Sequence, residues 1–363
     1  MNMQRWSKEK IWDWYNARPW MRGCTYMSAD CANRVDQWQG LGFEERWETN
    51  VQEVELMART GFNTVRIIPE FVVWQKEHDG FFERFDRYLE LFDAHGICAM
   101  VVLANDCMPP RSEDWKMPDV GEQHYDWGYH GGRKRSQHGR HNEPAPHYYF
   151  DDPTLREEYF TMVREIVTRY REDERVCVWD VYNEPGNSRR KDITMPHLVR
   201  MFETVRACEP TQPLTAGVWS AKPDEKVPLT EVEQYALDHS DLVSYHCYQP
   251  YPEHMRIIKR LKKEGRPLMN TEWLGRCMQN TVFDLIPLFY LEKIGCYNWG
   301  FVAGKYQTYE PWEWMWDRYA EDPHCSYDMT VWFHDLYRPN HRPYDPKEIA
   351  LIQEFCQYAE EER

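Results

Sequence analysis

The 363-residue sequence lacks several patterns that would indicate a bound metal or a nucleotide. It contains no C-x-x-C pair and no other cysteine and histidine spacing typical of a structural metal site. Neither glycine-rich phosphate motif, G-x-G-x-x-G or G-x-x-x-x-G-K-[ST], occurs. We therefore expect no metal and no cofactor.

Long apolar runs are also absent. No stretch approaches 18 consecutive apolar residues, so a transmembrane helix is not expected. The first ten residues have no apolar core of the signal-peptide type. The 11 cysteines are odd in number and widely scattered, which is more typical of reduced thiols than of a disulfide framework. Together these features predict a cytoplasmic protein.

Positive charge is in short supply. The chain has 44 basic and 60 acidic residues, a net charge of −16. Such a balance disfavours nucleic acids and anionic membranes as partners, and we expect neither. The sequence does not specify an oligomeric state.

Aromatic residues, in contrast, are abundant. The chain has 17 tryptophans and 23 tyrosines. Tryptophan has a flat apolar face and a hydrogen-bonding edge, which suits stacking on the C–H faces of sugar rings. The alternative is packing between helices and a sheet, and we expect this for more than half of them.

Short apolar runs alternate with amphipathic stretches, the pattern of βα units. Strands are expected at residues 21–26, 63–68, 97–103, 176–184, 213–218, 242–248, 267–272 and 295–299. Helices are expected at 8–15, 51–60, 82–94, 154–170, 197–207, 232–238, 255–263, 282–292 and 349–359. Eight parallel strands with right-handed crossovers close naturally into a barrel. The expected fold is thus α/β, a (β/α)8 TIM barrel forming one catalytic domain over residues 1–363. An open, doubly wound sheet is the alternative, but its phosphate motif is missing.

Two connections are too long to be simple turns. Residues 105–152 follow the third strand, and residues 304–345 follow the eighth and include four tryptophans. In barrels the loops after the strand ends build the active site. We expect both loops to wall a substrate pocket.

Two of the predicted strands end in a glutamate. The run 176–182 leads into Asn183-Glu184-Pro185, and the run 267–272 ends at Glu272. Proline stops the strand because it has no N–H to donate. Two carboxyl groups at the mouth of a barrel, about 5–5.5 Å apart, are what a retaining glycosidase needs. An arginine, Arg66, lies inside the apolar second strand, where it would support a nucleophilic carboxylate or form a salt bridge within the barrel.

Together these motifs resemble clan A glycoside hydrolases, and most of all glycoside hydrolase family 5, the cellulase and mannanase family. The similarity covers approximately residues 22–299, with the motifs in family order. It implies that Glu184 is the acid/base and Glu272 the nucleophile. It also implies that Asn183 binds the sugar 2-hydroxyl and that Arg66 supports Glu272.

The same resemblance assigns three further residues. His246 and Tyr248 match the His-x-Tyr of the family, with His246 on the acid/base side and Tyr248 orienting the nucleophile. Trp299, at the end of the last strand, would be the platform under the sugar in the −1 subsite. The chain departs from the family pattern at Leu274, which intervenes before Gly275, and at 103–106, where many relatives have a histidine. Neither departure touches the two glutamates.

A second Asn-Glu-Pro occurs at Glu143. No apolar strand precedes it, so we do not expect Glu143 to be catalytic. The surrounding histidines, which are His130, His138, His141 and His147, match no zinc spacing. We expect them to lie in a solvated or substrate-facing loop.

The leading hypothesis is a retaining β-glycosidase acting on short β-linked oligosaccharides. Long loops would narrow a groove to a pocket, which favours exo action of the β-mannosidase or β-glucosidase kind. An endo-acting β-1,4-glycanase, such as a mannanase, xylanase or endoglucanase, is the alternative. A non-catalytic sugar-binding barrel would have lost one glutamate, and a metal-dependent hydrolase would need more histidines at strand ends.

Overall fold

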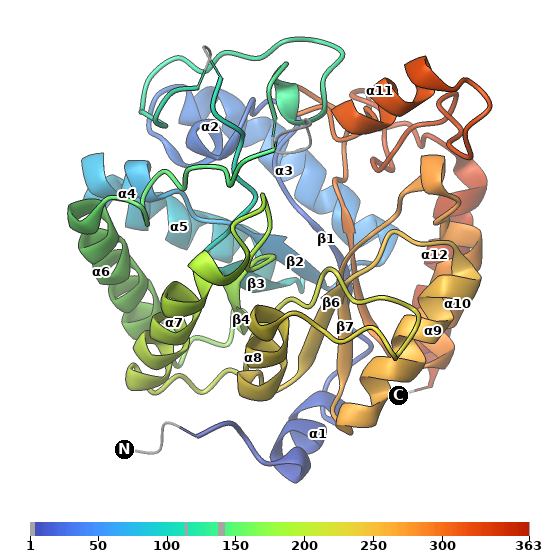
Figure 1. Cartoon of the computed structure of the whole chain (residues 1–363), viewed down its shortest axis with the longest axis horizontal. Helices are drawn as coiled ribbons and strands as arrows, with labels where there is room; N and C mark the ends of the chain where they lie inside the picture. The colour runs from blue at the N-terminus through green and yellow to red at the C-terminus, as the bar shows by residue number, and fades with distance from the viewer. Residues whose placement is uncertain (1–3, 113–114, 137–141, 363) are drawn as a thin grey trace.

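A computed structural model describes residues 4–112, 115–136 and 142–362 (Figure 1). Its strands are β1 Arg22–Thr25, β2 Thr64–Ile67, β3 Cys98–Val102, β4 Val176–Tyr182, β5 Leu214–Ala216, β6 Val243–His246, β7 Leu268–Trp273 and β8 Gly295–Trp299. Its α-helices are α1 Lys8–Asn16, α2 Arg34–Trp38, α3 Phe43–Thr60, α4 Phe71–Lys76, α5 His78–Asp93, α6 Pro153–Tyr170, α7 Met195–Ala207, α8 Glu231–His239, α9 Tyr251–Leu261, α10 Val282–Leu291, α11 Glu313–Glu321 and α12 Pro346–Glu361.

The eight strands form one parallel sheet in the order β5-β4-β3-β2-β1-β8-β7-β6. The two outer strands meet at a single parallel bridge between Val218 and Tyr245. There the N–H of Val218 donates to the carbonyl of Ser244 at 3.0 Å, and the N–H of His246 donates to the carbonyl of Val218 at 2.9 Å. The sheet therefore closes into a barrel, and the predicted (β/α)8 fold is confirmed.

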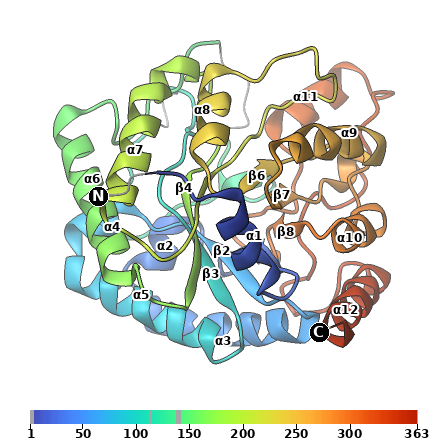
Figure 2. The ribbon, with the colours of Figure 1, turned by 90° about the horizontal axis from the view of Figure 1, so that it is seen from below.

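Helix α1 lies beneath the barrel, at the amino ends of the strands (Figure 2). Its buried Ile11 and Tyr15 join a core cluster with residues of β3, β4 and β7, among them Met100, Val178 and Met269. The hydroxyl of Tyr15 donates to the carbonyl of Lys293 at 3.0 Å. Helix α1 thus closes the amino end of the barrel, and the carboxyl end remains accessible for a functional site.

The outer helices pack an apolar stripe against the sheet. Helix α5 shows the pattern, burying residues of which Phe81, Phe85 and Phe92 are examples. Helix α6 begins where the sequence suggests, since Asp152 accepts hydrogen bonds from the N–H groups of Thr154 and Leu155 and Pro153 occupies the first turn. These local signals explain why most predicted helices are found close to their expected positions.

Three helices were not expected. Helices α2 and α4 are only five and six residues long, too short to show a helical period. Helix α11 lies inside the predicted 304–345 loop and has one buried residue, Met315. Helix α3 begins at Phe43 instead of residue 51.

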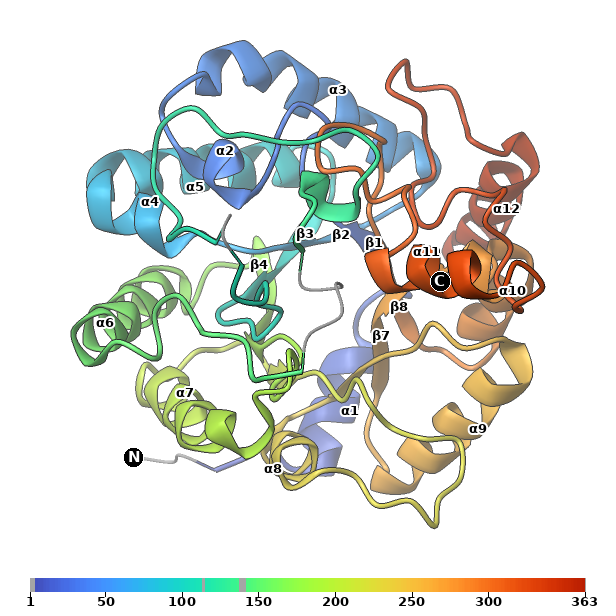
Figure 3. The ribbon, with the colours of Figure 1, turned by 45° about the horizontal axis from the view of Figure 1, so that its top comes forward.

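The long connections after β3 and β8 lie over the carboxyl ends of the strands, at the top of Figure 1, and Figure 3 turns this end toward the viewer. All 11 cysteines are free thiols, as expected. Within the described part of the chain, no helix combines the length and the apolar character needed to cross a membrane.

Candidate active site

The two glutamates lie at the open end of the barrel. Glu272 belongs to β7, in register with His246 of β6. Glu184 comes two residues after β4 and has a φ of 45°, in the left-handed region that non-glycine residues rarely adopt. Such strain is concentrated at functional sites, and here it turns the chain sharply at the strand tip.

His246 bridges the two carboxyl groups. Its Nδ1 lies 2.7 Å from Oε1 of Glu184 and 3.4 Å from Oε2 of Glu272. One polar atom from each of these three residues lies within 4.8 Å of the others. Glu184 and Glu272 are only 9% and 6% exposed. The geometry therefore holds two nearly buried carboxyl groups close enough to act on one bond.

Glu272 is held by a cation and a phenol. Nη1 of Arg66 donates to its Oε1 at 3.0 Å, and the hydroxyl of Tyr248 donates to its Oε2 at 3.0 Å. Arg66 is completely buried and also pairs with Asp180 at 2.8 Å. The same guanidinium donates to Oδ1 of Asn183 at 2.5 Å. Arg66 thus forms the salt bridge within the barrel and contacts the glutamate at its rim.

Glu184 has a different set of neighbours. Besides His246, it accepts hydrogen bonds at Oε2 from the amide of Asn187 and from the thiol of Cys107, the latter at 3.1 Å. No permanent cation appears among the contacts described for its carboxyl group. The two carboxyl groups are therefore chemically distinct.

The two groups titrate as a pair because they share His246. At Glu272, burial and the negative charge of Glu184 raise the pKa against the opposing charges of His246 and Arg66. At Glu184, burial is outweighed by the hydrogen bond and charge of His246, which lower the pKa. His246 exerts that charge only when it is protonated, whereas Arg66 is always cationic.

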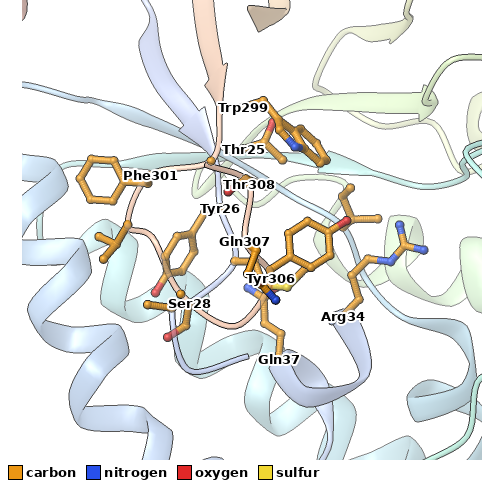
Figure 4. Close-up of a pocket in the computed structure, with 16 residues that line it drawn as sticks. Thr25, Tyr26, Ser28, Arg34, Gln37, Trp299, Phe301, Tyr306, Gln307 and Thr308 are labelled. Carbon is orange, nitrogen blue, oxygen red and sulfur yellow. The ribbon is translucent and has the colours of Figure 1, made fainter. Parts of the chain in front are cut away.

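A large cavity of about 1450 Å³ opens above these residues. Its aromatic walls come from both long loops and several strand ends, and comprise Trp115, Tyr148, Trp219, Tyr248, Trp299, Tyr306, Trp312, Trp314 and Tyr327. Trp299, Tyr306 and Arg34 also line a small hollow of about 40 Å³ beside it (Figure 4). All seven residues predicted for the site are near one another, and all but Arg66 line the large cavity.

The second Asn-Glu-Pro lies in the loop before α6, and its Asn142 lines the large cavity. Glu143 is exposed, and in the described part of the chain no strand occurs between β3 and α6. His130 and His147 are both buried. His130 bonds the carbonyl of Glu310 in the loop after β8 and also lines the large cavity, whereas His147 bonds the carbonyl of Asn105 within its own loop. His138 and His141 lie outside the described residues.

Among the described residues, the only cluster with metal-ligand geometry is Glu184, His246 and Glu272. Arg66 already neutralises Glu272 at 3.0 Å, and this leaves less negative charge than a divalent cation usually meets in a carboxylate site. The cluster fits acid–base chemistry better than metal binding.

Sequence reasoning missed several residues of this site. Asn187, Cys107 and Asn105 lie in loops, and Asp180 lies inside β4. Asp180 could have been predicted from the sequence, because a carboxyl group in an apolar strand needs a buried partner such as Arg66. The three loop residues could not have been predicted, since their positions depend on how the chain turns after each strand.

Solved structures with the same fold support this description of the barrel. An exo-β-1,4-mannosidase from the Opitutaceae bacterium strain TAV5 matches at 14% identity and a TM-score of 0.58, over 94% of this chain and 60% of that one. This chain therefore spans less than two thirds of that enzyme. An endo-β-1,4-mannanase from Thermotoga petrophila matches at 15% identity and a TM-score of 0.55, over 95% of this chain and 78% of that one.

A family 5 protein from Streptomyces cattleya, solved in complex with Manβ1-4GlcNAc, matches at 10% identity and a TM-score of 0.57, over 94% of this chain and 81% of that one. A search of the curated proteins found no match. The family model described as cellulase (glycosyl hydrolase family 5) matches residues 31–301. Since this match covers well over half of the chain and agrees with the predicted resemblance, the protein is a glycoside hydrolase and belongs to family 5.

Proposed function

We propose that this protein is a retaining β-glycosidase that works by double displacement, with Glu272 as the nucleophile and Glu184 as the acid/base. The observation that carries the proposal is the asymmetry of the two carboxyl groups. Arg66 and Tyr248 donate to Glu272, whereas Glu184 contacts no permanent cation among its described partners. Their close approach fits the short separation of retaining enzymes.

The protonation states follow from these neighbours. With His246 neutral, the charge that favours ionised Glu184 is gone, while Arg66 still favours ionised Glu272. The single proton of the pair is then best placed on Glu184. This is the state that a retaining enzyme needs before it binds substrate.

In the first step, Glu272 attacks the anomeric carbon and forms a glycosyl ester as the glycosidic C–O bond breaks. Glu184 gives its proton to the departing oxygen. In the second step, Glu184 takes a proton from water, and the water oxygen displaces Glu272. Asn183 would bind the sugar 2-hydroxyl during both steps, and Trp299 would stack under the ring.

For the substrate, we propose short β-linked oligosaccharides cleaved by exo action, with β-mannosides as the first class to test. The chain would act as one catalytic domain in the cytoplasm. Two features support this proposal: loops from both long connections wall the cavity, and the fold is shared with an exo-β-1,4-mannosidase. The endo-β-1,4-mannanase among the similar structures keeps endo action as the second candidate.

Azide rescue of the two alanine variants tests the roles. Glu272→Ala should lose turnover and, with azide, give an α-glycosyl azide, because azide attacks from the vacated nucleophile side. Glu184→Ala should retain cleavage of activated aryl glycosides and give a β-glycosyl azide. Wild-type rates in both variants would refute the assignment.

A substrate panel separates exo from endo action. It should contain aryl β-mannosides and β-glucosides, β-linked disaccharides including Manβ1-4GlcNAc, and β-1,4-mannan. Release of single sugars from chain ends supports exo action. If mannan instead yields oligomers of mixed length within the first minutes, the enzyme is endo-acting and the proposal of exo action is wrong.

A further inference from the structure

Oε2 of Glu184 faces two hydrogen-bond donors that the roles above do not use. The thiol of Cys107 donates to it at 3.1 Å, and the side-chain amide of Asn187 also donates to it. Oε1 of the same carboxyl group lies on the other side, 2.7 Å from Nδ1 of His246. Because that Nδ1 also lies 3.4 Å from Glu272, Oε1 is the oxygen on the side of the nucleophile.

Cys107 links the acid/base to the neighbouring amides. Its sulfur accepts hydrogen bonds from Nδ2 of Asn183 and Nδ2 of Asn187, each at 3.5 Å. Its own backbone N–H donates to Oδ1 of Asn105 at 2.9 Å, and Asn183 donates to the same oxygen at 2.9 Å. The thiol is thus held in place by a turn and has its hydrogen directed at Glu184.

The donors restrict where a proton can sit on Glu184. A side-chain amide N–H can only donate, and a thiol that accepts from two amides has only its S–H left to offer. Both lone pairs of Oε2 are therefore occupied by donors. We propose that Cys107 and Asn187 are positioning residues for Glu184, which make Oε2 the carbonyl oxygen of the protonated carboxyl group and leave the catalytic proton on Oε1.

The chemistry of Cys107 fits this role. Burial, together with the charges of Glu184 and Glu272, raises the pKa of the thiol well above its usual value. The sulfur therefore keeps its hydrogen at neutral pH and remains a donor. A thiolate in this place would repel the carboxylate that Glu184 becomes after it gives up its proton.

The inference rests on the proposed role of Glu184 and adds to it. In the first step the Oε1–H bond breaks as the leaving oxygen gains the proton, and the carboxylate that forms is stabilised by the two donors on Oε2. The ionisable groups facing Glu184 are Cys107, His246, Tyr248 and Glu272.

Leaving-group dependence tests the inference. In Cys107→Ala and in Asn187→Ala, kcat/KM should fall about tenfold for glycosides with poor leaving groups, which need the proton. It should change less than about twofold for the dinitrophenyl glycoside of the same sugar, which leaves without help. The basic limb of the pH profile should move to higher pH, because fewer donors stabilise the carboxylate and the pKa of Glu184 rises.

Three comparisons make the result specific. Cys107→Ser keeps one donor and its acceptor capacity and should recover most of the lost rate. Cys208→Ala removes a buried thiol at the end of α7. It should change neither the ratio of kcat/KM between the two kinds of glycoside nor the pH profile. Thermal unfolding followed by circular dichroism verifies that each variant is folded.

Equal losses on both glycosides with an unmoved pH profile would overturn the inference, because packing alone would then explain them. An unchanged rate would overturn it as well. Glu184→Ala separates this failure from that of the proposed function. If that variant shows leaving-group dependence and Cys107→Ala does not, only the present inference falls. If Glu184→Ala shows none, both fall.

Discussion

At the scale of single residues, Arg66 and Tyr248 give Glu272 a chemical environment different from that of Glu184. Both donate to Glu272, and Arg66 is held rigidly because it also pairs with Asp180 inside the barrel. Removing Arg66 would leave two buried carboxyl groups without their cation, which is costly for folding as well as for catalysis. Tyr248 is the better residue for isolating an effect on the reaction.

Tyr248→Phe removes one hydroxyl and keeps the ring. We expect kcat to fall about tenfold to a hundredfold, because Glu272 loses a donor that orients it for attack. Steady-state kinetics measures this on any glycoside that the wild type cleaves. Tyr170→Phe is the matched control, since it removes a hydroxyl that bonds Asp86 on the outer layer and should leave kcat unchanged. A wild-type kcat in Tyr248→Phe would contradict the role given to the phenol.

At the scale of elements, β4 and β7 show what local sequence can predict. Apolar, β-branched runs that end in Asn-Glu-Pro or in Glu indicate strands, and parallel strands of one barrel bring their carboxyl ends to one rim. The strands, their order and the meeting of Glu184 with Glu272 were therefore predictable. Cys107 and Asn187 were not, because their contacts depend on the path of loops that have no periodicity. The short α11 was missed for the same reason.

Helix α3 is joined to the loop after β1 by the buried carboxyl group of Glu53. It contacts the N–H of Ala29 at 3.1 Å and the hydroxyl of Tyr26 at 2.8 Å. That hydroxyl also lies 2.9 Å from Oδ1 of Asn50, and it has only one hydrogen to give. A protonated Glu53 satisfies all of these atoms, because it can donate to Tyr26 while Tyr26 donates to Asn50.

This arrangement predicts a pH dependence of stability. Burial raises the pKa of Glu53 from 4.5 to about 8, so between these values the folded protein holds a proton that the unfolded chain has lost. Stability from this group is complete below pH 4.5 and is lost as the pH rises toward 8. The Tm of the wild type should fall more between pH 5.5 and 8 than that of Glu53→Gln, by about 2 °C or more. Glu45→Gln, an exposed change on the same helix, should show the same fall in Tm as the wild type. If the Tm of Glu53→Gln also falls as much as that of the wild type, Glu53 is ionised in the folded protein and the prediction is wrong.

At the scale of the whole molecule, the barrel separates stability from chemistry. Helix α1 plugs the amino end of the barrel (Figures 1 and 2). The two glutamates lie at the carboxyl ends of β4 and β7, where they line the large cavity. Side chains at the plug should therefore contribute to stability without affecting turnover.

Ile11→Ala tests this separation. Ile11 is completely buried in the cluster under the barrel, so the variant should lose about 2–4 kcal/mol of unfolding free energy. Its kcat at 25 °C should stay within about twofold of the wild type, because α1 lies at the amino end of the barrel, opposite the glutamates. Denaturant unfolding and steady-state kinetics measure the two quantities. Asp13→Ala, on the exposed side of α1, should change neither; a large loss of kcat in folded Ile11→Ala would show that the two ends are coupled.

The central claim, that Glu272 attacks the sugar and forms a covalent ester, can be tested directly by trapping. A 2-deoxy-2-fluoro glycosyl fluoride of the preferred sugar slows both steps, and its good leaving group lets the first outrun the second. Intact-protein mass spectrometry followed by peptide mapping then locates the adduct. Our account predicts one fluorosugar per chain on the peptide that contains Glu272, and none in Glu272→Gln. An adduct on Glu184, or steady turnover with inverted product and no adduct, would contradict it.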